Sequence, residues 1–366
     1  MEFVVNRESL LPVLGKVVGV VERRQTLPIL GNLLVSAKGD RVDLCATDLE
    51  VEARAFCPVS IHQEGETTLP ARKLMDIVRN LAEGTEIRFR MSGERCAVTA
   101  GRGRFALGVL PAADFPLMQV DLAGHEAHVS EKTFRTILDK TAFAMAQQDV
   151  RYYLNGLLLE WQRTGMTAVA TDGHRLAKFE CPMDIDIEDR LQVIVPSKTV
   201  LELKRQLSGG DGEIQILVGP RNIRLVIGEM LMTSKLVDGR YPEYERVIPR
   251  ELDKVALVST EALKRALART AILSNEKYRG VRLAFEPGVL RLQAHNPEQE
   301  EAEEEIELEY DGEPTSIGFN VSYLSDALNA VSGDQVQVQF NDGGSSSVWR
   351  GQNAEDETYV VMPMRL

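Results

Sequence analysis

The chain reads Ile29-Leu30-Gly31-Asn32-Leu33-Leu34 near its start, and similar stretches follow at Leu154-Asn155-Gly156-Leu157-Leu158-Leu159 and Tyr278-Arg279-Gly280-Val281-Arg282-Leu283. The three glycines are 125 and 124 residues apart. A polar pair follows each stretch, at Thr47-Asp48, Thr171-Asp172 and His295-Asn296, again 124 residues apart. Such self-similarity indicates tandem copies of one folding unit, and this spacing is a normal domain size. We therefore predict three modules, at residues 1–125, 126–250 and 251–366.

Hydrophobic periodicity predicts the same elements in each module. Apolar residues spaced three and four apart predict first helices at 7–21, 130–145 and 259–274, and second helices at 70–81, 196–207 and 320–331. Period-two alternation predicts strands at 41–46, 86–90, 166–171, 213–217, 289–294 and 335–340. Ser9, Ser130 and Ser259 or Thr260 are expected to cap the first helices. The pattern favours the α+β class, with helices packed on antiparallel sheets in a repeated module.

Composition indicates a well-packed globular protein, with 44% hydrophobic and 6% aromatic residues. No apolar run approaches the roughly 18 residues of a membrane helix, and residues 1–7 lack a signal-peptide pattern. We therefore expect a cytoplasmic protein with no membrane partner. Cys45, Cys57, Cys96 and Cys181 show no C-x-x-C spacing, so they are interpreted as reduced core thiols. No metal site and no cofactor are expected.

Charge is distributed unevenly along the chain, whose net charge is −13. Lys and Arg number 15 against 16 Asp and Glu in residues 1–125, 17 against 18 in 126–250, and 10 against 21 in 251–366. Residues 7–24, 70–81, 130–145, 196–207, 259–274 and 319–331, which include the six predicted helices, nevertheless carry 16 basic and 8 acidic residues. A positive helical layer in an acidic protein favours a local polyanion-binding surface. The alternative is that these side chains only decorate solvated helix faces.

Ring geometry limits what such modules could enclose. If helices spaced by about 9 Å line a ring, six of them leave a bore of only about 7 Å. Twelve helices from two chains leave about 24 Å, which is enough for a duplex. A ring around DNA would therefore need two copies of the chain.

The two end modules carry opposite charges that favour head-to-tail pairing. Module three has eight Glu residues between Glu298 and Glu309, whereas module one offers cationic and apolar side chains around a strand pair. Two such contacts related by a two-fold axis would close a dimer. The alternative is a solvated acidic strand. The predicted interface residues are Lys73, Arg95, Arg102, Arg104, Phe105, Leu107, Ile272, Leu273, Glu298, Glu300, Glu301, Glu303 and Glu304.

Several long motifs resemble one family, the bacterial DNA polymerase III beta subunits or beta sliding clamps. They are TLPILGN at 26–32, QDVRYYLNG at 148–156, ATDGHRL at 170–176, SKLVDGRYP at 234–242, NPEQE at 296–300 and YVVMPMRL at 359–366. The resemblance covers all three modules and implies a ring-shaped homodimer with helices lining the hole. It implies a nucleoid-associated, non-catalytic processivity factor for DNA replication. The implied partners are double-stranded DNA, an ATP-dependent clamp loader, replicative and translesion DNA polymerases, and mismatch-repair and ligase-type clients.

The resemblance also implies two sets of site residues. The DNA contacts it implies are Arg24, Arg72, Gln148, Tyr152 and Tyr153; if the two tyrosines are neighbours on a strand, one of them should be in the core. Between modules two and three it implies a groove for short client peptides. The groove residues are Leu154, Thr171, Gly173, His174, Arg175, Leu176, Pro242, Arg246, Val247, Asn320, Tyr323, Val360, Met362, Pro363, Met364, Arg365 and Leu366.

The tail that ends this groove set is unusual, because Met362, Met364 and Leu366 give it an apolar face that something must cover. Methionine suits a surface that accepts many partners, since its side chain repacks easily. An ordinary edge strand is the alternative. The chain departs from the family pattern at 342–346, where relatives often have a branched apolar residue near Gly344, so one groove wall is expected to be looser.

Two other functions must be considered. Asp172-Gly173-His174 places a carboxylate near an imidazole, and a hydrolase could recruit Ser197 as its nucleophile. However, the chain contains no G-x-S-x-G, Walker A or H-E-x-x-H motif, and its five His residues show no metal-ligand spacing. A repeat scaffold that binds proteins but no DNA would keep the groove and lack the pore; the positive helices favour the clamp.

Overall fold

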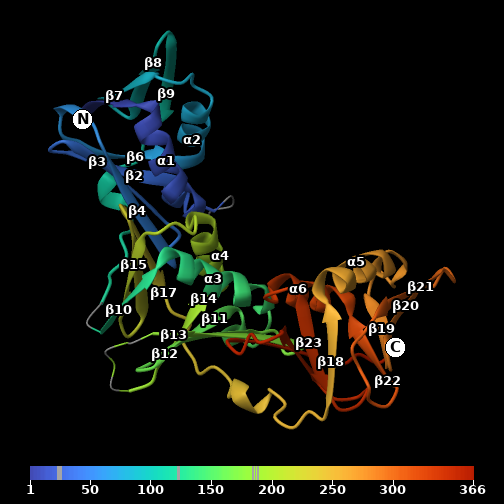
Figure 1. The fold of residues 1–366 in the computed structure, drawn as a ribbon. Helices are drawn as coiled ribbons and strands as arrows, with labels where there is room; N and C mark the ends of the chain where they lie inside the picture. The colour runs from blue at the N-terminus through green and yellow to red at the C-terminus, as the bar shows by residue number, and fades with distance from the viewer. Residues whose placement is uncertain (23–26, 122–123, 184, 186, 188) are drawn as a thin grey trace. The chain divides into compact units, whose positions relative to one another are not determined.

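The computed structural model describes residues 1–22, 27–121, 124–183, 185, 187 and 189–366. Its contacts group into two compact units, residues 1–134 with 201–236 and residues 135–200 with 237–366. Each unit therefore combines one end module with part of module two. Figure 1 shows the elements of the chain, all of whose sheets are antiparallel.

The first unit contains two sheets. The five-stranded sheet has the order β5 (Ser60–Gln63), β1 (Glu2–Asn6), β7 (Glu86–Ser92), β8 (Arg95–Ala100) and β9 (Gly103–Gly108). The eight-stranded sheet has the order β10 (His125–Ser130), β15 (Glu213–Val218), β16 (Asn222–Ile227), β17 (Met230–Lys235), β4 (Val51–Pro58), β3 (Arg41–Thr47), β2 (Asn32–Lys38) and β6 (Gly65–Pro70). Strands β17 and β4 pair from Met230–Ala55 to Ser234–Val51, so this sheet runs from module two into module one without a break.

The second unit repeats this arrangement. Its eight-stranded sheet has the order β14 (Leu191–Pro196), β11 (Gly156–Gln162), β12 (Gly165–Thr171), β13 (Arg175–Pro182), β25 (Glu357–Val361), β24 (Ser347–Gly351), β23 (Gln335–Phe340) and β18 (Lys254–Ser259). Its four-stranded sheet has the order β21 (Glu301–Glu307), β20 (Val289–His295), β19 (Gly280–Glu286) and β22 (Thr315–Asn320). The pairing of β13 with β25 joins modules two and three.

The described residues form six α-helices, which lie where the periodicity predicts them. They are α1 (Arg7–Val17), α2 (Ala71–Arg79), α3 (Glu131–Thr141), α4 (Ser197–Gln206), α5 (Thr260–Thr270) and α6 (Val321–Ala330). A short 3-10 turn extends each first helix, at Val18–Val20, Ala142–Ala144 and Ala271–Leu273. The pairs α1–α2 and α5–α6 lie side by side (Figure 1). All six predicted strands and six predicted helices are therefore confirmed, as is the α+β class.

Large side chains fill the space between helices and sheets. Phe3 stacks on Phe89 with ring centroids 4.7 Å apart, and Phe285 lies 4.5 Å from Phe340. Trp349 is buried in the second unit, and its indole donates to the Ser347 hydroxyl at 2.8 Å. Each buried aromatic side chain contributes roughly 1.5–3 kcal/mol to folding. The cores therefore leave the sheet edges and the strand-to-helix junctions available for function.

Candidate functional site

A buried apolar cluster underlies the predicted peptide groove. Leu154, Leu158, Val169 and Leu176 come from module two, and Val348 and Val360 come from module three. Tyr241 and Tyr244, which follow β17 in the chain, close the cluster and are almost fully buried. Strands β13 and β25 hold the two modules in register here, with Leu176 opposite Val360. Both modules therefore contribute to the cluster that lies under the predicted groove.

A tight turn between β12 and β13 adjoins this cluster. The Thr171 hydroxyl donates to the Arg175 carbonyl at 2.6 Å and accepts from Gly173 N. The Asp172 carboxylate accepts from the backbone N–H groups of His174 and Arg175 at 2.9 and 3.0 Å. Gly173 has a φ of 87°, a left-handed conformation that favours glycine, and a Cβ there would lie 2.9 Å from the Arg151 guanidinium.

Module one contains the same turn, 124 residues earlier. Thr47 donates to Val51 O and accepts from Leu49 N, while Asp48 accepts from Glu50 N and Val51 N. Because Asp172 repeats this structural role, its carboxylate is turned toward backbone N–H groups and the Arg175 guanidinium rather than toward the imidazole. The hydrolase alternative has no support in this geometry.

Arg175 joins the turn to module three. Its guanidinium contacts Asp172 at 3.2 Å and Asp326 at 2.5 Å, and it donates to the Phe143 carbonyl at 2.8 Å. The same guanidinium lies 4.6 Å from the ring centroid of Tyr323, within cation–π range. Its side chain is only 12% exposed. Arg175 is thus a buried link between the turn and module three rather than an open contact surface.

His174 and Tyr323 form one wall of the predicted groove. Their rings stack with centroids 6.2 Å apart and planes inclined by 17°. Burial raises the pKa of Tyr323, and the nearby Asp172 carboxylate adds to the shift. Asn320, also predicted in the groove, uses its side-chain oxygen to cap α6, accepting from Ser322 N at 2.9 Å. Sequence reasoning assigned it only to the groove and missed this capping role.

The tail after β25 is anchored at two points. Met362 N donates to His174 O at 3.0 Å, and Met364 N donates to Gly318 O at 2.7 Å. The side chains of Met362, Pro363 and Met364 are half-buried. The tail is thus an ordered wall with an apolar, adaptable surface.

The other groove residues fall into two groups. Leu154, Leu176 and Val360 are fully buried and belong to the cluster under the predicted groove. Pro242, Arg246 and Val247 are exposed on the segment after Tyr241, and Val247 is 39% exposed. Arg246 pairs with Glu243 at 2.6 Å. Tyr241 and Tyr244 were not predicted to lie here, although Tyr241 belongs to the motif at 234–242.

The loop that departs from the family pattern is locally ordered. The Asp342 carboxylate accepts from Gly344 N at 2.8 Å and from the Ser345 hydroxyl at 2.9 Å, and these bonds lower its pKa. A Cβ at Gly343 would lie 2.4 Å from Ser316 O, whereas one at Gly344 would meet only Asp342, at 3.5 Å. Gly343 is therefore sterically required, and Gly344 leaves room where a side chain could stand.

The structure describes four of the five predicted DNA contacts. Arg24 lies outside the described residues. Arg72 is exposed on α2, donates to Val21 O at 2.6 Å, and lines a cavity of about 380 Å³ with Arg79 and Arg205. Gln148 is exposed with a φ of 55°. Beside it, the Arg151 guanidinium holds the pKa of Asp149 at about 2.

Tyr152 and Tyr153 correct one expectation. They lie in a 3-10 turn, Tyr152–Leu154, and not on a strand, because β11 begins only at Gly156. Tyr152 is 56% exposed, whereas Tyr153 packs against the groove cluster. Their rings meet edge to face, with centroids 5.7 Å apart. Tyr153 is thus the partly buried member of the pair, and the turn, rather than strand alternation, separates the two side chains.

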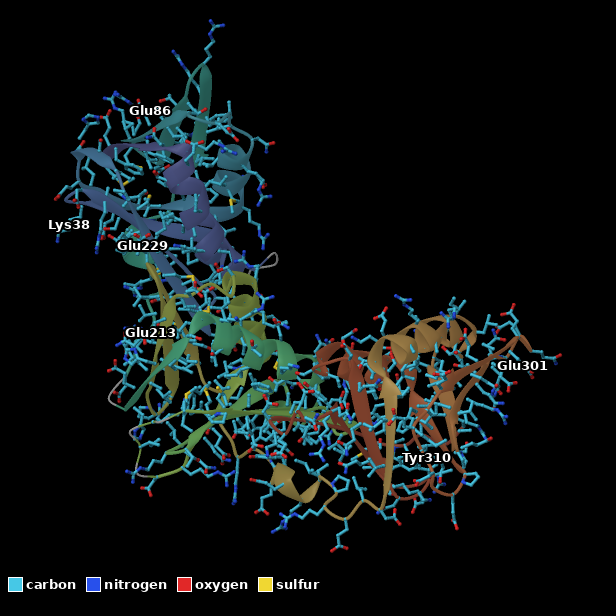
Figure 2. The ribbon with its side chains drawn as sticks, viewed as in Figure 1. Lys38, Glu86, Glu213, Glu229, Glu301 and Tyr310 are labelled. Atoms are coloured by element: carbon cyan, nitrogen blue, oxygen red, sulfur yellow. The ribbon has the colours of Figure 1, made fainter. Side chains whose placement is uncertain are left out.

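The predicted dimer residues lie on two sheet edges. In the first unit β9 is an edge strand; Arg95, Arg102 and Arg104 are exposed beside it, while Phe105 is half-buried and Leu107 is buried. Lys73 is exposed on α2. In the second unit β21 is an edge strand, and Glu301 points away from its tip (Figure 2). Next to it, Ile272 is 75% exposed and Leu273 is half-buried.

The acidic residues of this edge differ in exposure and in ion pairing. Glu298, Glu300, Glu301 and Glu303 are exposed. The Glu304 carboxylate is paired with Arg269 of α5 at 2.6 Å, which lowers its pKa. Ala302, Glu304 and Ile306 are the less exposed residues of β21, which packs against α5. Glu304 is thus engaged within its own module.

The comparisons with known proteins agree along the whole chain. Three models of the DNA polymerase III beta subunit match it, the N-terminal domain at residues 1–119, the central domain at 128–243 and the C-terminal domain at 245–365. The beta sliding clamp of Pseudomonas aeruginosa is 50% identical over 367 residues, which cover 100% of both chains. The chain belongs to the DNA polymerase III beta subunit family.

Solved structures of the family share this fold. The crystal structure of the DNA polymerase III subunit beta from Pseudomonas aeruginosa matches with a TM-score of 0.96 and 49% identity, covering 100% of both chains. A sliding clamp from the same organism bound to griselimycin matches equally well, with a TM-score of 0.96, 49% identity and 100% of both chains covered. The chain therefore has the three-domain clamp fold and is a non-catalytic processivity factor.

The described residues also bear on metal sites, disulfides and membrane-spanning helices. Among the described residues, no group of three or more His, Cys, Asp or Glu side chains could hold a metal ion. Cys45, Cys57 and Cys96 are buried free thiols, and Cys181 is half-buried. Of the helices that the structure describes, none is long and apolar enough to cross a membrane.

Proposed function

We propose that two copies of the chain close head to tail around duplex DNA and carry client proteins by short peptides bound in the groove. The observation that carries the client site is the anchored tail. Its two backbone hydrogen bonds hold Met362 and Met364 beside the buried cluster and the His174–Tyr323 wall. Alternating apolar side chains above an ordered floor suit an extended peptide.

Closure of the ring is supported by the two edge strands. Edge strands present unpaired backbone groups that can pair with another chain. Beside β9, Arg95, Arg102 and Arg104 have no ion-pair partner among the described residues, and beside β21 the exposed Glu298 to Glu303 carry the opposite sign. A head-to-tail contact would bring the signs together, and a two-fold axis would repeat it.

DNA binding is proposed to be independent of sequence. Arg24, Arg72, Gln148, Tyr152 and Tyr153 combine cationic, polar and aromatic groups without a base-reading element. Phosphate contacts hold DNA without reading its sequence, and a small number of them permits movement along the duplex. The proposed partners are double-stranded DNA, a clamp loader, replicative and translesion polymerases, and mismatch-repair and ligase-type clients. A cytoplasmic, nucleoid-associated location fits this set.

Retention on circular DNA tests the ring. The protein is loaded by a clamp loader onto a nicked circle and passed through a gel-filtration column. We expect it to elute with the DNA and to be lost after a restriction enzyme linearises the circle. Equal retention on linear DNA with free ends would contradict encirclement. A protein that binds client peptides but never co-elutes with the circle would instead be a scaffold.

A further inference from the structure

Modules two and three are in register over residues 156–206 and 280–330. Strands β11, β12 and β14 and helix α4 begin at residues 156, 165, 191 and 197, and β19, β20, β22 and α6 begin 124 positions later. The strand pairing is conserved with the same offset: Leu158 opposite Val169 becomes Arg282 opposite Gln293, and Gly156 opposite Pro196 becomes Gly280 opposite Asn320. Residues in the two modules can therefore be compared one to one.

In module two, the face of the sheet around Leu158, Val169 and Ile194 is covered. Leu158, Val169 and Ile194 belong to the buried cluster, and Tyr241 and Tyr244 complete it. The segment that carries both tyrosines is fastened by Val237 N, which donates to Ile194 O at 2.9 Å. In module three Met364 N makes the equivalent bond to Gly318 O at 2.7 Å. The tail therefore follows the course of the Val237 segment.

In module three the same position holds a cavity. Residues equivalent to Leu158 and Val169 are Arg282 and Gln293, and Gly318 replaces Ile194. Leu366 takes the space over Gly318 and Gly280, where a Cβ would lie 2.9 and 2.3 Å from its side chain. Beyond Leu366 a cavity of about 600 Å³ remains, lined by Arg282 and Gln293 together with Tyr278, His295 and Pro297. Among the described residues that line it, none is equivalent to Tyr241 or Tyr244.

The lining of this cavity is cationic and partly apolar. Arg282 and Arg365 contribute two guanidinium groups, and neither has an ion-pair partner among the described residues. The lining includes no Asp or Glu, although module three has 21 acidic residues. Lys277, which does not line the cavity, lies 5.2 Å from the ring centroid of the lining residue Tyr278. Tyr278, Pro297 and Met364 supply the apolar surface.

We infer that this cavity, the module-three cleft, binds an extended segment of a partner protein that carries an aromatic side chain beside carboxylates. The aromatic group would fill the volume that the tyrosines fill in module two, and the carboxylates would meet Arg282 and Arg365. Residues 238–245 of the chain itself have this chemistry, since Tyr241 and Tyr244 are accompanied by Asp238, Glu243 and Glu245 against one Arg. The cleft shares Met364, Arg365 and Leu366 with the predicted groove residues but is lined by neither His174 nor Tyr323, so this inference goes beyond the proposed client groove.

A synthetic peptide with the sequence of residues 238–245 is the probe. Fluorescence anisotropy with the full-length protein should show saturable binding, weakened at least about tenfold by Arg282→Glu and by Gln293→Trp, which fills the cavity. A peptide with both tyrosines replaced by Ala should bind at least about tenfold more weakly as well. Circular dichroism and dimer mass check that each variant folds.

A groove variant separates this site from the client groove. Val247→Asp should weaken a polymerase-derived client peptide and leave the 238–245 peptide unaffected. If Val247→Asp weakened the 238–245 peptide and Arg282→Glu did not, the peptide would lie in the groove and the inference would be wrong. Equal binding to the unmodified protein and to both cleft variants would also overturn it. Failure of the client peptide alone would count against the groove and leave the cleft supported.

Discussion

Lys140 Nζ lies 2.6 Å from the Oε2 atom of Glu357, a side chain with no solvent exposure. Lys140 belongs to α3 of module two and Glu357 to β25 of module three. The ammonium also donates to the Ser332 hydroxyl at 2.6 Å and to the Ala330 carbonyl. The carboxylate accepts in addition from Ser332 N at 2.7 Å and Gly351 N at 2.9 Å. This network fastens the two modules that build the groove.

Replacing Lys140 by Met should weaken the junction strongly. The substitution leaves Glu357 buried with its charge unpaired, which typically costs about 3–5 kcal/mol. Urea unfolding followed by tryptophan fluorescence should show this loss, because Trp349 and Trp161 are both buried in the second unit. The Lys140→Met/Glu357→Gln double variant should recover part of it, since no net charge is then buried. Equal stability of Lys140→Met and the unmodified protein would show that the pair contributes nothing.

Ile272 and Leu273 should hold the dimer together. Burying each side chain against a partner contributes roughly 1.5–3 kcal/mol, whereas each ion pair at the rim adds about 0–1 kcal/mol. The double Ala variant should therefore be monomeric in light scattering at micromolar concentration. Leu201→Ala is a matched control, because Leu201 is also exposed, by 60%, but lies on α4. A dimer that persists in the double variant would disprove this interface.

Deleting Met362–Leu366 should abolish binding of polymerase-derived peptides. Two apolar peptide side chains on the groove floor contribute roughly 3–6 kcal/mol before association costs, so micromolar affinity is expected for the intact protein. Calorimetry measures the loss, and light scattering should show that the dimer remains. Val255→Ala is the control for a change at another exposed apolar position, because Val255 lies on β18. Unchanged affinity in the truncated protein would reduce the tail to an edge segment.

Arg24→Glu should shorten the lifetime of the protein on nicked circular DNA without unfolding it. The predicted contact is a phosphate contact, so its reversal adds repulsion, and the effect should shrink as salt screens it. Arg163→Glu makes the same charge change on an exposed residue between β11 and β12. It should leave the lifetime unchanged. Identical lifetimes for Arg24→Glu and Arg163→Glu would remove Arg24 from the DNA-binding set.

Thiol reactivity should distinguish Cys181 from the other three cysteines. Burial raises the pKa of Cys45 to about 12 and the pKa values of Cys57 and Cys96 to about 11, so thiolate is scarce at pH 8. Cys181 is half-buried, and its pKa is raised as well. With a disulfide reagent at pH 8, the folded protein should release at most one equivalent, slowly, and Cys181→Ser should remove it. Rapid release of several equivalents would show that the cores open readily.

The sequence predicted periodic elements well because their causes are local. Ser130 and Ser259 cap α3 and α5, accepting from Thr133 N and Ala262 N as expected. Ser9 was wrong as a cap, since α1 begins at Arg7 directly after β1 and Asn6 occupies the cap position. Tyr152 and Tyr153 were wrongly placed on a strand because a 3-10 turn precedes the glycine of the motif.

The groove depended on contacts between residues far apart in the chain. The resemblance supplied its residue set, yet it could not separate floor from wall. Arg175 reaches Asp326, 151 residues away, and Lys140 reaches Glu357, 217 residues away. Such partners follow from the pairing of β13 with β25. Hydrophobic periodicity does not predict which distant strands pair. The module-three cavity could not be predicted for the same reason, because residues 275–297 and the distant residues 364–366 line it together.

The constant offset of 124 between β11–α4 and β19–α6 has a historical consequence. Outside this block the offset drifts, for example to 129 between β10 and β18 and to 122 between β15 and β23. If the modules arose by duplication of an ancestral unit, the block has kept no net insertion or deletion, whereas its flanks have. A single inserted residue within a strand would turn its inward side chains outward, which selection removes. Divergence in the block was thus confined to substitutions. A change such as Leu158 to Arg282 could make one site apolar and its equivalent cationic without disturbing the backbone.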